Sequence, residues 1–377
     1  MIKRLISVFT VMLLTAAIGR PVFANADDVL KSAGLDISST ASSVPAPMAV
    51  VAKKTSSHTT SNSAVGGTLV VQPDDGRNPV INLINSAQSS IDVTIYTISD
   101  SQVVSALVAA AKKGVAVRVI YNYNSFAAKN IFPNDSAVQQ IVAAGGQAQK
   151  ASSNFTITHQ KTITVDGTTS LIMTFNLSAS YFTNTRDFGY ITTDSTQVGE
   201  IENVFTADWS GSDITPSVDS LVWSPVNSRS KLLDLINNAQ KTLIIDSEET
   251  SDKQCMTALI NAAKRGVSVR FLTAVLSSNS TADSTSGGGT DGNAAERKVL
   301  NAAGVQAKGA TNHYMHAKMM IADYGTSAQV GFLGSENFSS TSLDKNRELG
   351  VLLYDQTSLD RIDGIFESDW SANASNS

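Results

Sequence analysis

Two separate stretches of the chain carry a histidine and a lysine with one residue between them. The first holds His159 and Lys161, and the second holds His316 and Lys318. In an extended strand, side chains two positions apart project to the same face, so each stretch would place a cation beside an imidazole. An imidazole can transfer a proton or attack an electrophile, and a cation can stabilise negative charge nearby. The chain has four histidines, and two of them belong to this repeated pair.

Each pair is followed by an aspartate at the same distance. Asp166 comes seven positions after His159, and Asp323 comes seven positions after His316. Seven is an odd spacing, so in a regular strand each aspartate would point away from the face that carries the histidine. We therefore expect Asp166 and Asp323 to have structural roles.

The doubled His-x-Lys-x4-Asp pattern resembles that of the phospholipase D superfamily, whose members bring two such motifs together at one phosphodiester-cleaving site. That family usually follows each motif with Gly-Ser-x-Asn, and the second copy here has a glycine, Ser335 and Asn337. The first copy has Met173 at the glycine position but keeps a hydroxyl and an amide in Thr174 and Asn176. The resemblance implies that these four polar side chains bind the substrate.

Two acidic residues occupy a further position that this family uses. Asp187 and Glu348 match the place where it carries an acid that hydrogen-bonds the catalytic histidine. A carboxylate that accepts from one ring nitrogen would fix the tautomer of the imidazole. The alternative is that each acid pairs with the arginine before it, Arg186 or Arg347. Two such acids at equivalent places in a duplicated chain favour the functional role.

Cleaving a phosphodiester requires its negative charge to be neutralised, a positioned nucleophile and a proton for the leaving oxygen. The resemblance implies that His159 attacks phosphorus to form a phosphohistidine, and that protonated His316 donates to the leaving group and then activates water. Lys161 and Lys318 would hold the phosphoryl oxygens. The chain shows no carboxylate cluster at metal-ligand spacing, so we expect no metal and no other cofactor.

An internal repeat indicates a duplicated module. The segment 84–88 recurs as 236–240 and the segment 112–115 recurs as 264–267, both after 152 positions. In each copy, helix-like segments alternate with β-branched runs of strand length, which favours crossover connections and a mostly parallel sheet. Helices are expected at 79–87, 103–113, 231–239, 256–264 and 294–303, and strands at 91–96, 115–121, 242–246 and 267–273. The predicted fold is α/β, with two mostly parallel or mixed sheets flanked by helices, packed with pseudo-two-fold symmetry around one site at their junction.

The chain before these modules differs in composition. Residues 1–26 begin with two basic residues, continue through an apolar run and end in Ala-Asn-Ala, which predicts a cleaved export signal. A membrane anchor is disfavoured because a span needs about 20 apolar residues. Residues 27–66 are rich in Ser, Thr, Ala and Pro and are expected to be disordered. The two modules would then occupy 67–212 and 213–377, in a protein that is secreted or periplasmic.

Other features leave two interpretations open. The segments 122–134, which is aromatic, and 277–292, which is rich in Ser, Thr and Gly, are either rims of the substrate site or ordinary surface loops. Glu248 and Glu249 end a predicted strand near that edge. They could contact a substrate hydroxyl or a cationic head group, or they could cap the following helix.

The charge balance separates the candidate functions. Removing the predicted signal deletes three basic residues and no acid, which takes the formal net charge from −5 to −8. Because nucleic-acid binders usually present a basic surface, a phospholipid or membrane surface is favoured as the partner over nucleic acid. We therefore expect a monomeric phosphodiesterase acting on phospholipid head groups, with a nuclease as the alternative and transfer to an alcohol left open. A non-catalytic binding module is disfavoured because both His-Lys pairs are intact.

Overall fold

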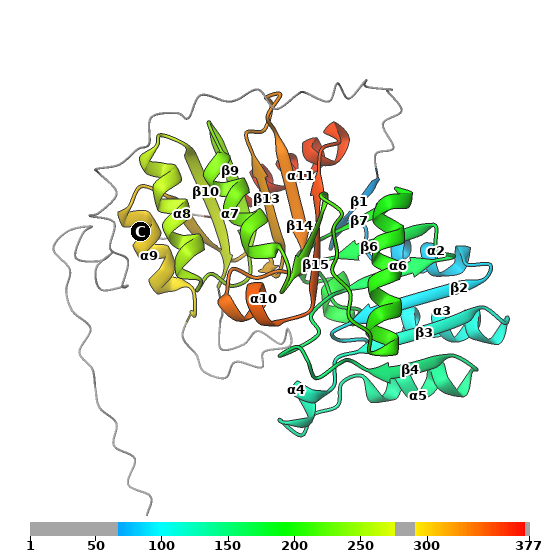
Figure 1. Cartoon of the computed structure of the whole chain (residues 1–377). Helices are drawn as coiled ribbons and strands as arrows, with labels where there is room; N and C mark the ends of the chain where they lie inside the picture. Colours follow the sequence, from blue (N-terminus) through cyan, green and yellow to red (C-terminus); the bar gives the residue numbers. More distant parts are fainter. Residues whose placement is uncertain (1–66, 276–290, 374–377) are drawn as a thin grey trace, which may run out of the picture.

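The computed structural model describes residues 67–275 and 291–373 (Figure 1). The predicted export signal at 1–26, the predicted leader at 27–66 and nearly all of the loop at 277–292 lie outside the described residues. The first half contains β1 (Thr68–Gln72), α2 (Asn78–Ser86), β2 (Ser90–Ile95), α3 (Ser101–Lys112), β3 (Ala116–Tyr121), α4 (Asn124–Ala127), α5 (Asp135–Ala143), β4 (Gln147–Lys150), β5 (Thr162–Val165), β6 (Thr169–Met173), the 3-10 helix η2 (Ala179–Phe182), β7 (Thr185–Thr192) and α6 (Ser195–Ser210).

The second half repeats this order. It contains β8 (Leu221–Ser224), α7 (Ser228–Asn238), β9 (Thr242–Ser247), α8 (Lys253–Lys264), β10 (Ser268–Ala274), α9 (Ala294–Ala302), β11 (Gln306–Ala310), β12 (Tyr314–Met315), β13 (Lys318–Ala322), β14 (Val330–Gly334), α10 (Ser340–Lys345), β15 (Glu348–Leu353) and α11 (Gln356–Ala372).

The strands form two sheets. The first has the order β1-β7-β6-β5-β2-β3-β4, with β12 of the second half added beside β7. The second has the order β11-β10-β9-β13-β14-β15-β8. The expected duplicated α/β fold is confirmed, and of the two expected kinds of sheet, mostly parallel or mixed, both sheets are mixed. Among the strands of 67–275 and 291–373, the parallel pairings are those within β2-β3-β4 and β9-β10-β11 and the β7-β12 pair.

The remaining strand pairs are antiparallel, and two of them, β5-β6 and β13-β14, are hairpins with no helix between their strands. Strands β5 and β6 are joined by a short turn in which Asp166 and Gly167 have φ angles of 53° and 61°. Asp and Gly tolerate this left-handed region better than most residues. The helix–strand alternation predicted at 79–121 does not continue through this turn, which joins two strands directly.

The same local signals begin and end the central helix of each half. Asp100 caps α3 by accepting from two backbone amides of its first turn, and Asp252 does the same for α8. Each helix is followed by a glycine in the left-handed region, Gly114 or Gly266. These capping residues fix where each helix starts and stops, and therefore where the flanking strands run.

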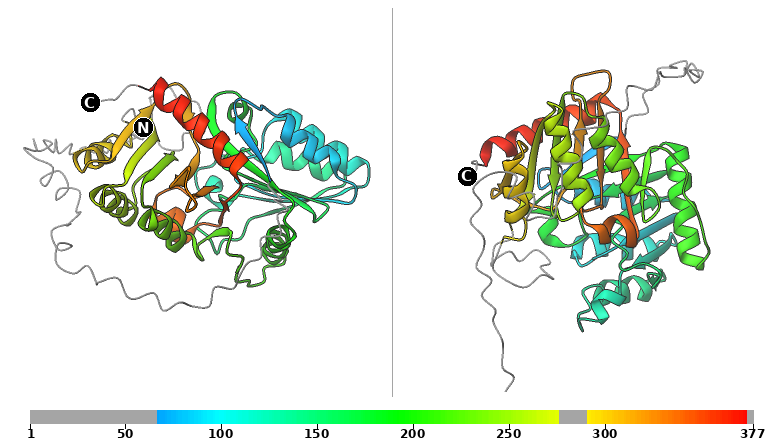
Figure 2. Two further views of the ribbon diagram at one scale, coloured as in Figure 1. Left: turned by 90° about the horizontal axis from the view of Figure 1, so that it is seen from above. Right: turned by 60° about the vertical axis from the view of Figure 1, so that its left-hand side comes forward.

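Helices cover the outer faces of both sheets, and the inner faces meet in a shared core. Helices α2, α3 and α5 pack on the first sheet, and α7, α8 and α9 pack on the second. Between the sheets lies a third apolar cluster, which includes Phe188, Trp223, Met319 and Phe366. Figure 2 shows α11 running over the junction, where Arg361 donates to the carbonyl oxygen of Leu69 in β1.

Two buried ion pairs join the halves at equivalent positions. Arg186 in β7 bonds Asp369 in α11, with an N–O distance of 2.6 Å, and Arg347 bonds Asp208 in α6, with a distance of 2.8 Å. Each arginine belongs to one half and each aspartate to the other. The halves are therefore related by a pseudo-two-fold arrangement, in which an arginine of each half pairs with an aspartate of the other.

Candidate active site

The two imidazoles of the repeated motifs are each oriented by an acid from the opposite half. His159 Nδ1 lies 2.8 Å from Oε2 of Glu348, and His316 Nδ1 lies 2.8 Å from Oδ1 of Asp187. Both acids are fully buried. The sequence-based prediction matched each acid to a catalytic histidine without saying which, and the structure shows that the pairing crosses between modules.

These contacts fix the tautomer of His159. Its Nδ1 faces the Glu348 carboxylate and, at 3.2 Å, the carbonyl oxygen of Ser335, both of which only accept. Nδ1 must therefore carry the proton, which leaves the lone pair of Nε2 directed away from the acid. Burial, followed by the nearby Lys161 ammonium, lowers the pKa of His159 to about 4. His159 is thus a neutral imidazole with an available Nε2 near pH 7.

The two motif lysines lie buried beneath the histidines. Each Nζ donates to the carbonyl oxygen of the histidine in its own motif, at 2.6 Å for both Lys161 and Lys318. Burial, followed by repulsion from Lys318, lowers the pKa of Lys161 to about 7. The ammonium groups of Lys161 and Lys318 repel each other, so an anion that contacted both would be stabilised by both.

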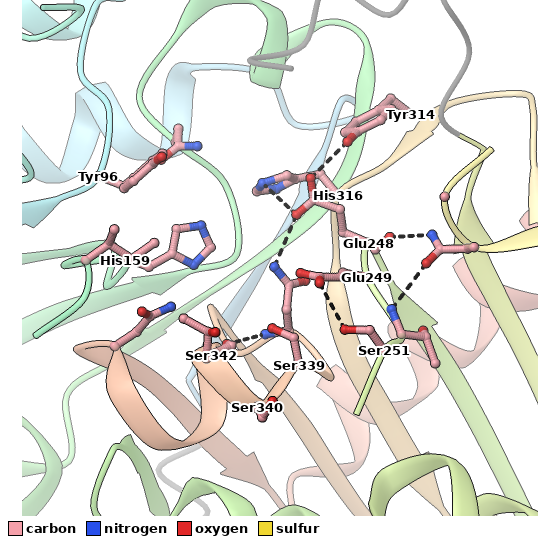
Figure 3. Close-up of a pocket in the computed structure, with 18 of the residues that line it drawn as sticks. Tyr96, His159, Glu248, Glu249, Ser251, Tyr314, His316, Ser339, Ser340 and Ser342 are labelled. Atoms are coloured by element: carbon pink, nitrogen blue, oxygen red, sulfur yellow. Dashed lines mark hydrogen bonds and ion pairs between the residues drawn. The ribbon is translucent and has the colours of Figure 1, made fainter. Parts of the chain in front are cut away.

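A pocket of about 560 Å³ opens between the halves, and both histidines line it. Figure 3 shows the two imidazoles facing this pocket from opposite sides. The first half also contributes Tyr96, Asn176 and Tyr181, and the second half contributes Glu248, Glu249, Tyr314, Asn337, Asn346 and residues 339–342. Both motifs therefore serve a single site at the junction.

The two sides of the pocket differ at one equivalent position. In the first half, Tyr96 directly follows β2 and packs edge-on against His159, with ring centroids 5.0 Å apart. In the second half, Glu248 takes this place, bonding Lys318 Nζ at 2.8 Å and lying 3.5 Å from Nε2 of His316. Burial opposes ionisation of Glu248, but Lys318 and His316 outweigh it and hold its pKa well below the ordinary value. Glu248 does not cap the following helix, because Asp252 caps α8, and Glu248 lines the pocket.

The predicted substrate ligands separate into two groups. Asn176 and Asn337 line the pocket, as a substrate contact would require. The side chains of Thr174 and Ser335 are fully buried, and neither residue is among those that line the pocket. Thr174 donates to the Asp187 carboxylate at 2.5 Å, and the Ser335 hydroxyl accepts from the backbone amide of Leu349. Both side chains therefore support the site from its buried side.

The motif aspartates lie away from the pocket. Asp166 accepts hydrogen bonds from the backbone amides of residues 88–90, and Asp323 accepts from those of residues 240–242. Desolvation opposes ionisation of Asp166, but these amides lower its pKa to about 2. These hydrogen bonds connect the turn after each motif strand to the start of another strand. Asp166 is connected in this way to the segment that leads into β2, and Asp323 to the segment that leads into β9.

Several site residues were not found from the sequence. Ser342 and Asn346 donate to Oε1 of Glu348 at 2.6 and 2.8 Å, so they fix the carboxylate that orients His159. Tyr181 and Tyr314 pack against the His316 ring, with centroids 4.8 and 6.4 Å away. Tyr314 could have been suspected because it stands two positions before His316 in an extended segment. The others come from helical turns whose placement depends on the tertiary fold.

The two expected rim segments have different relations to the pocket. None of the residues 122–134 lines it, although Phe126 supports it by packing on Tyr96 at 4.9 Å. Gly292, at the end of the other segment, does line it. Within 67–275 and 291–373, no group of three or more His, Cys, Asp and Glu side chains is arranged to hold a metal ion. No helix in this part of the chain is long and apolar enough to cross a membrane.

Comparison with known proteins was made for sequence families and for solved structures. A family model described as the PLD-like domain of cardiolipin synthase matches residues 80–209 and 232–370. No match was found among curated proteins. Phosphatidylserine synthase from Haemophilus influenzae Rd KW20 is similar with a TM-score of 0.60, at 13% identity, over 81% of this chain and 88% of that chain.

Two further structures are similar over different shares of their length. Polyphosphate kinase from Porphyromonas gingivalis has a TM-score of 0.62 at 17% identity over 80% of this chain. The match covers 46% of that kinase, so this chain spans about half of its length. Nuc from Salmonella typhimurium, a phospholipase D family member, is 25% identical over 40% of this chain and 98% of its own, with a TM-score of 0.36. The matched part of the polyphosphate kinase therefore shares the fold of this chain.

Proposed function

The chain belongs to the phospholipase D superfamily, and we propose that it is a metal-independent phosphodiesterase that cleaves phospholipid head-group esters. One observation carries the proposal. Two His-Lys pairs meet at a single pocket, and each histidine is oriented by a buried acid of the opposite half. This arrangement provides a nucleophile, a proton donor and fixed positive charge around one phosphate.

In the first step, Nε2 of His159 attacks phosphorus. The P–N bond forms as the bond from phosphorus to the leaving oxygen breaks, and that oxygen takes the proton from Nε2 of His316. Lys161 and Lys318 balance the charge on the non-bridging oxygens, with the amides of Asn176 and Asn337 beside them.

In the second step, water attacks the phosphohistidine. His316, now neutral, accepts the proton of the water, and the P–N bond breaks to restore His159. An alcohol that replaced water in this step would give transfer in place of hydrolysis. The Glu348 carboxylate stabilises the positive ring that exists while His159 is phosphorylated.

The surroundings of the two rings support this division of roles. His159 has an aromatic neighbour and a pKa lowered to about 4, as suits a neutral nucleophile. His316 has a carboxylate near each nitrogen, Asp187 at Nδ1 and Glu248 at 3.5 Å from Nε2. These two carboxylates give the ring an acceptor near each nitrogen, an arrangement that suits a proton donor.

We favour a phospholipid over nucleic acid as the substrate because of charge. The chain is acidic overall, and its acids include two at the pocket, Glu248 and Glu249. A polyanion would meet repulsion at such a surface. Export to the periplasm or medium, through the predicted signal at 1–26, would bring the enzyme to membrane surfaces, where we expect it to act as a monomer.

The test is to incubate the purified protein, in EDTA, with phosphatidylcholine vesicles and separately with single-stranded DNA. Release of choline or phosphatidic acid is the expected result, and a variant with His159→Ala should release neither. Cleavage of DNA without any lipid product would replace this proposal with the nuclease alternative.

A further inference from the structure

Glu248 occupies a position in the pocket where an anion would otherwise bind. Its Oε2 lies 2.8 Å from Nζ of Lys318, 3.5 Å from Nε2 of His316 and 3.5 Å from Nδ2 of Asn337. These are the cation, the proton donor and the amide that the proposed mechanism assigns to the phosphoryl group and the leaving oxygen. Tyr314 donates its hydroxyl proton to the other oxygen, Oε1, at 2.8 Å, which anchors the carboxylate there.

The first half has no such charge. Position 96 is equivalent to position 248, and there Tyr96 presents a ring to His159 and lies near Lys161, whose Nζ is 5.4 Å from the ring centroid. Duplication would give both sides the same chemistry, and this substitution makes them different. One side of the pocket is therefore aromatic, and the other carries an ionised carboxylate that is 23% exposed.

The proposed reaction places the leaving group on the side of Glu248. His159 attacks from one side, so the leaving oxygen must lie opposite, next to His316. Once a phosphate engages Lys318, the carboxylate of Glu248 remains beside the atoms attached to that oxygen. Its ionisation is maintained by Lys318 and His316.

We propose that Glu248 determines specificity for the charge of the leaving group. It admits alcohols that carry no negative charge, such as choline, ethanolamine or glycerol, and disfavours those with an anionic group close to the ester oxygen, such as serine. Like charges held close together in a partly buried site repel strongly, whereas an ammonium or hydroxyl can pair with the carboxylate. This inference rests on the proposed function and on His316 as the proton donor.

A purely structural role for Glu248 makes a different prediction. If it only held Lys318 in place, its loss would slow every substrate by a similar factor. A charge-selecting role changes the ratio between substrates. The informative quantity is therefore the ratio of kcat/KM for two lipids with the same acyl chains.

The experiment compares phosphatidylcholine with phosphatidylserine in neutral detergent micelles, for the natural protein and for Glu248→Gln. The glutamine keeps the shape of the side chain and removes its charge. We expect the preference for phosphatidylcholine to fall by about tenfold or more in the variant. The matched control is Glu249→Gln, which removes a neighbouring charge that bonds Ser251 rather than Lys318, and it should change the ratio much less. An unchanged ratio in Glu248→Gln would overturn the inference.

A second measurement does not depend on turnover. Titration calorimetry with inorganic phosphate should show tighter binding to Glu248→Gln than to the natural protein, by about tenfold, because no internal anion competes for Lys318. Equal affinities would contradict the role of Glu248. If the natural protein hydrolyses neither lipid, the proposed function fails, and the phosphate titration still decides whether Glu248 opposes anions in this pocket.

Discussion

The imidazole of His159 and the carboxylate of Glu348 lie 2.8 Å apart although they belong to different halves of a duplicated chain. The same exchange occurs between His316 and Asp187. Neither half contains both a motif histidine and the acid that orients it. The site is thus assembled by the junction of the modules and not by either module alone.

Because each acid orients a histidine of the other half, replacing one acid should slow the reaction. Glu348→Gln keeps the size of the side chain but can present an N–H to His159, which disfavours the tautomer with a free Nε2 lone pair. We expect kcat to fall by about 10² or more with little change in KM, because substrate contacts remain. Circular dichroism checks the fold, and the exposed Asp213→Asn serves as a control that should keep full activity. A KM effect alone would argue against an orienting role for Glu348.

The two motif lysines indicate that the reaction needs no metal ion. Activity should survive EDTA because the phosphoryl charge is balanced by Lys161 and Lys318. Replacing either lysine with alanine should slow turnover by about 10² or more, the scale seen when one preorganised charge-stabilising group is removed. Steady-state rates with and without chelator test both statements. Inactivation by EDTA that added metal reverses would show that the mechanism needs an ion.

The pKa values of two buried groups predict the pH profile. His159 must be neutral to attack, and its pKa of about 4 means that activity is lost only as the pH falls through about 4. Lys161 must be charged, and its pKa of about 7 means that activity declines as the pH rises through about 7. The profile of kcat/KM should therefore have a plateau on the acidic side of neutrality, with limbs that belong to the coupled site. An acidic limb near 6.5 would show that the environment of His159 does not lower its pKa.

The roles of the two histidines can be separated with a p-nitrophenyl phosphodiester, whose leaving group needs no proton. His316→Ala should still release a burst of p-nitrophenol and accumulate phosphorylated enzyme, because only the second step is blocked. His159→Ala should show neither. Rapid-mixing absorbance and mass spectrometry follow the two products. Phosphate found on His316 in the His159→Ala protein would reverse the assignments.

Replacing Asp166 should change the stability of the fold without changing the reaction. Its carboxylate accepts several backbone amides, so Asp166→Ala should lower the free energy of unfolding by about 1–3 kcal/mol. Its pKa is lowered to about 2, below that of an unfolded aspartate, so its contribution is present above about pH 4 and is lost as the pH falls towards 2. Denaturant unfolding at pH 7 and pH 3 measures both effects. KM at pH 7 should be unchanged, and a large rise in KM would place Asp166 in the site after all.

Local sequence predicted much of the fold and part of the site. The repeat and the helix–strand rhythm identified a duplicated α/β module because apolar periodicity and capping residues are local signals. The hairpins were missed because β5 and β6 are short and nearly all of their residues are buried, so they show no alternation of buried and exposed positions. Which acid orients which histidine could not be predicted, since Glu348 is 189 positions from His159 and only the packing of the halves brings them together. The burial of Thr174 and Ser335 depends on the same packing.

The exchanged ion pairs, Arg186 with Asp369 and Arg347 with Asp208, also bear on how the protein unfolds. Separating the halves would expose their shared apolar core and remove the aspartate of the other half from each of two buried arginines, at a cost that neither half could recover by itself. Opening of one half should therefore destabilise the other. We expect a single cooperative thermal transition, with calorimetric and van't Hoff enthalpies that agree, although the sequence contains two copies of one module.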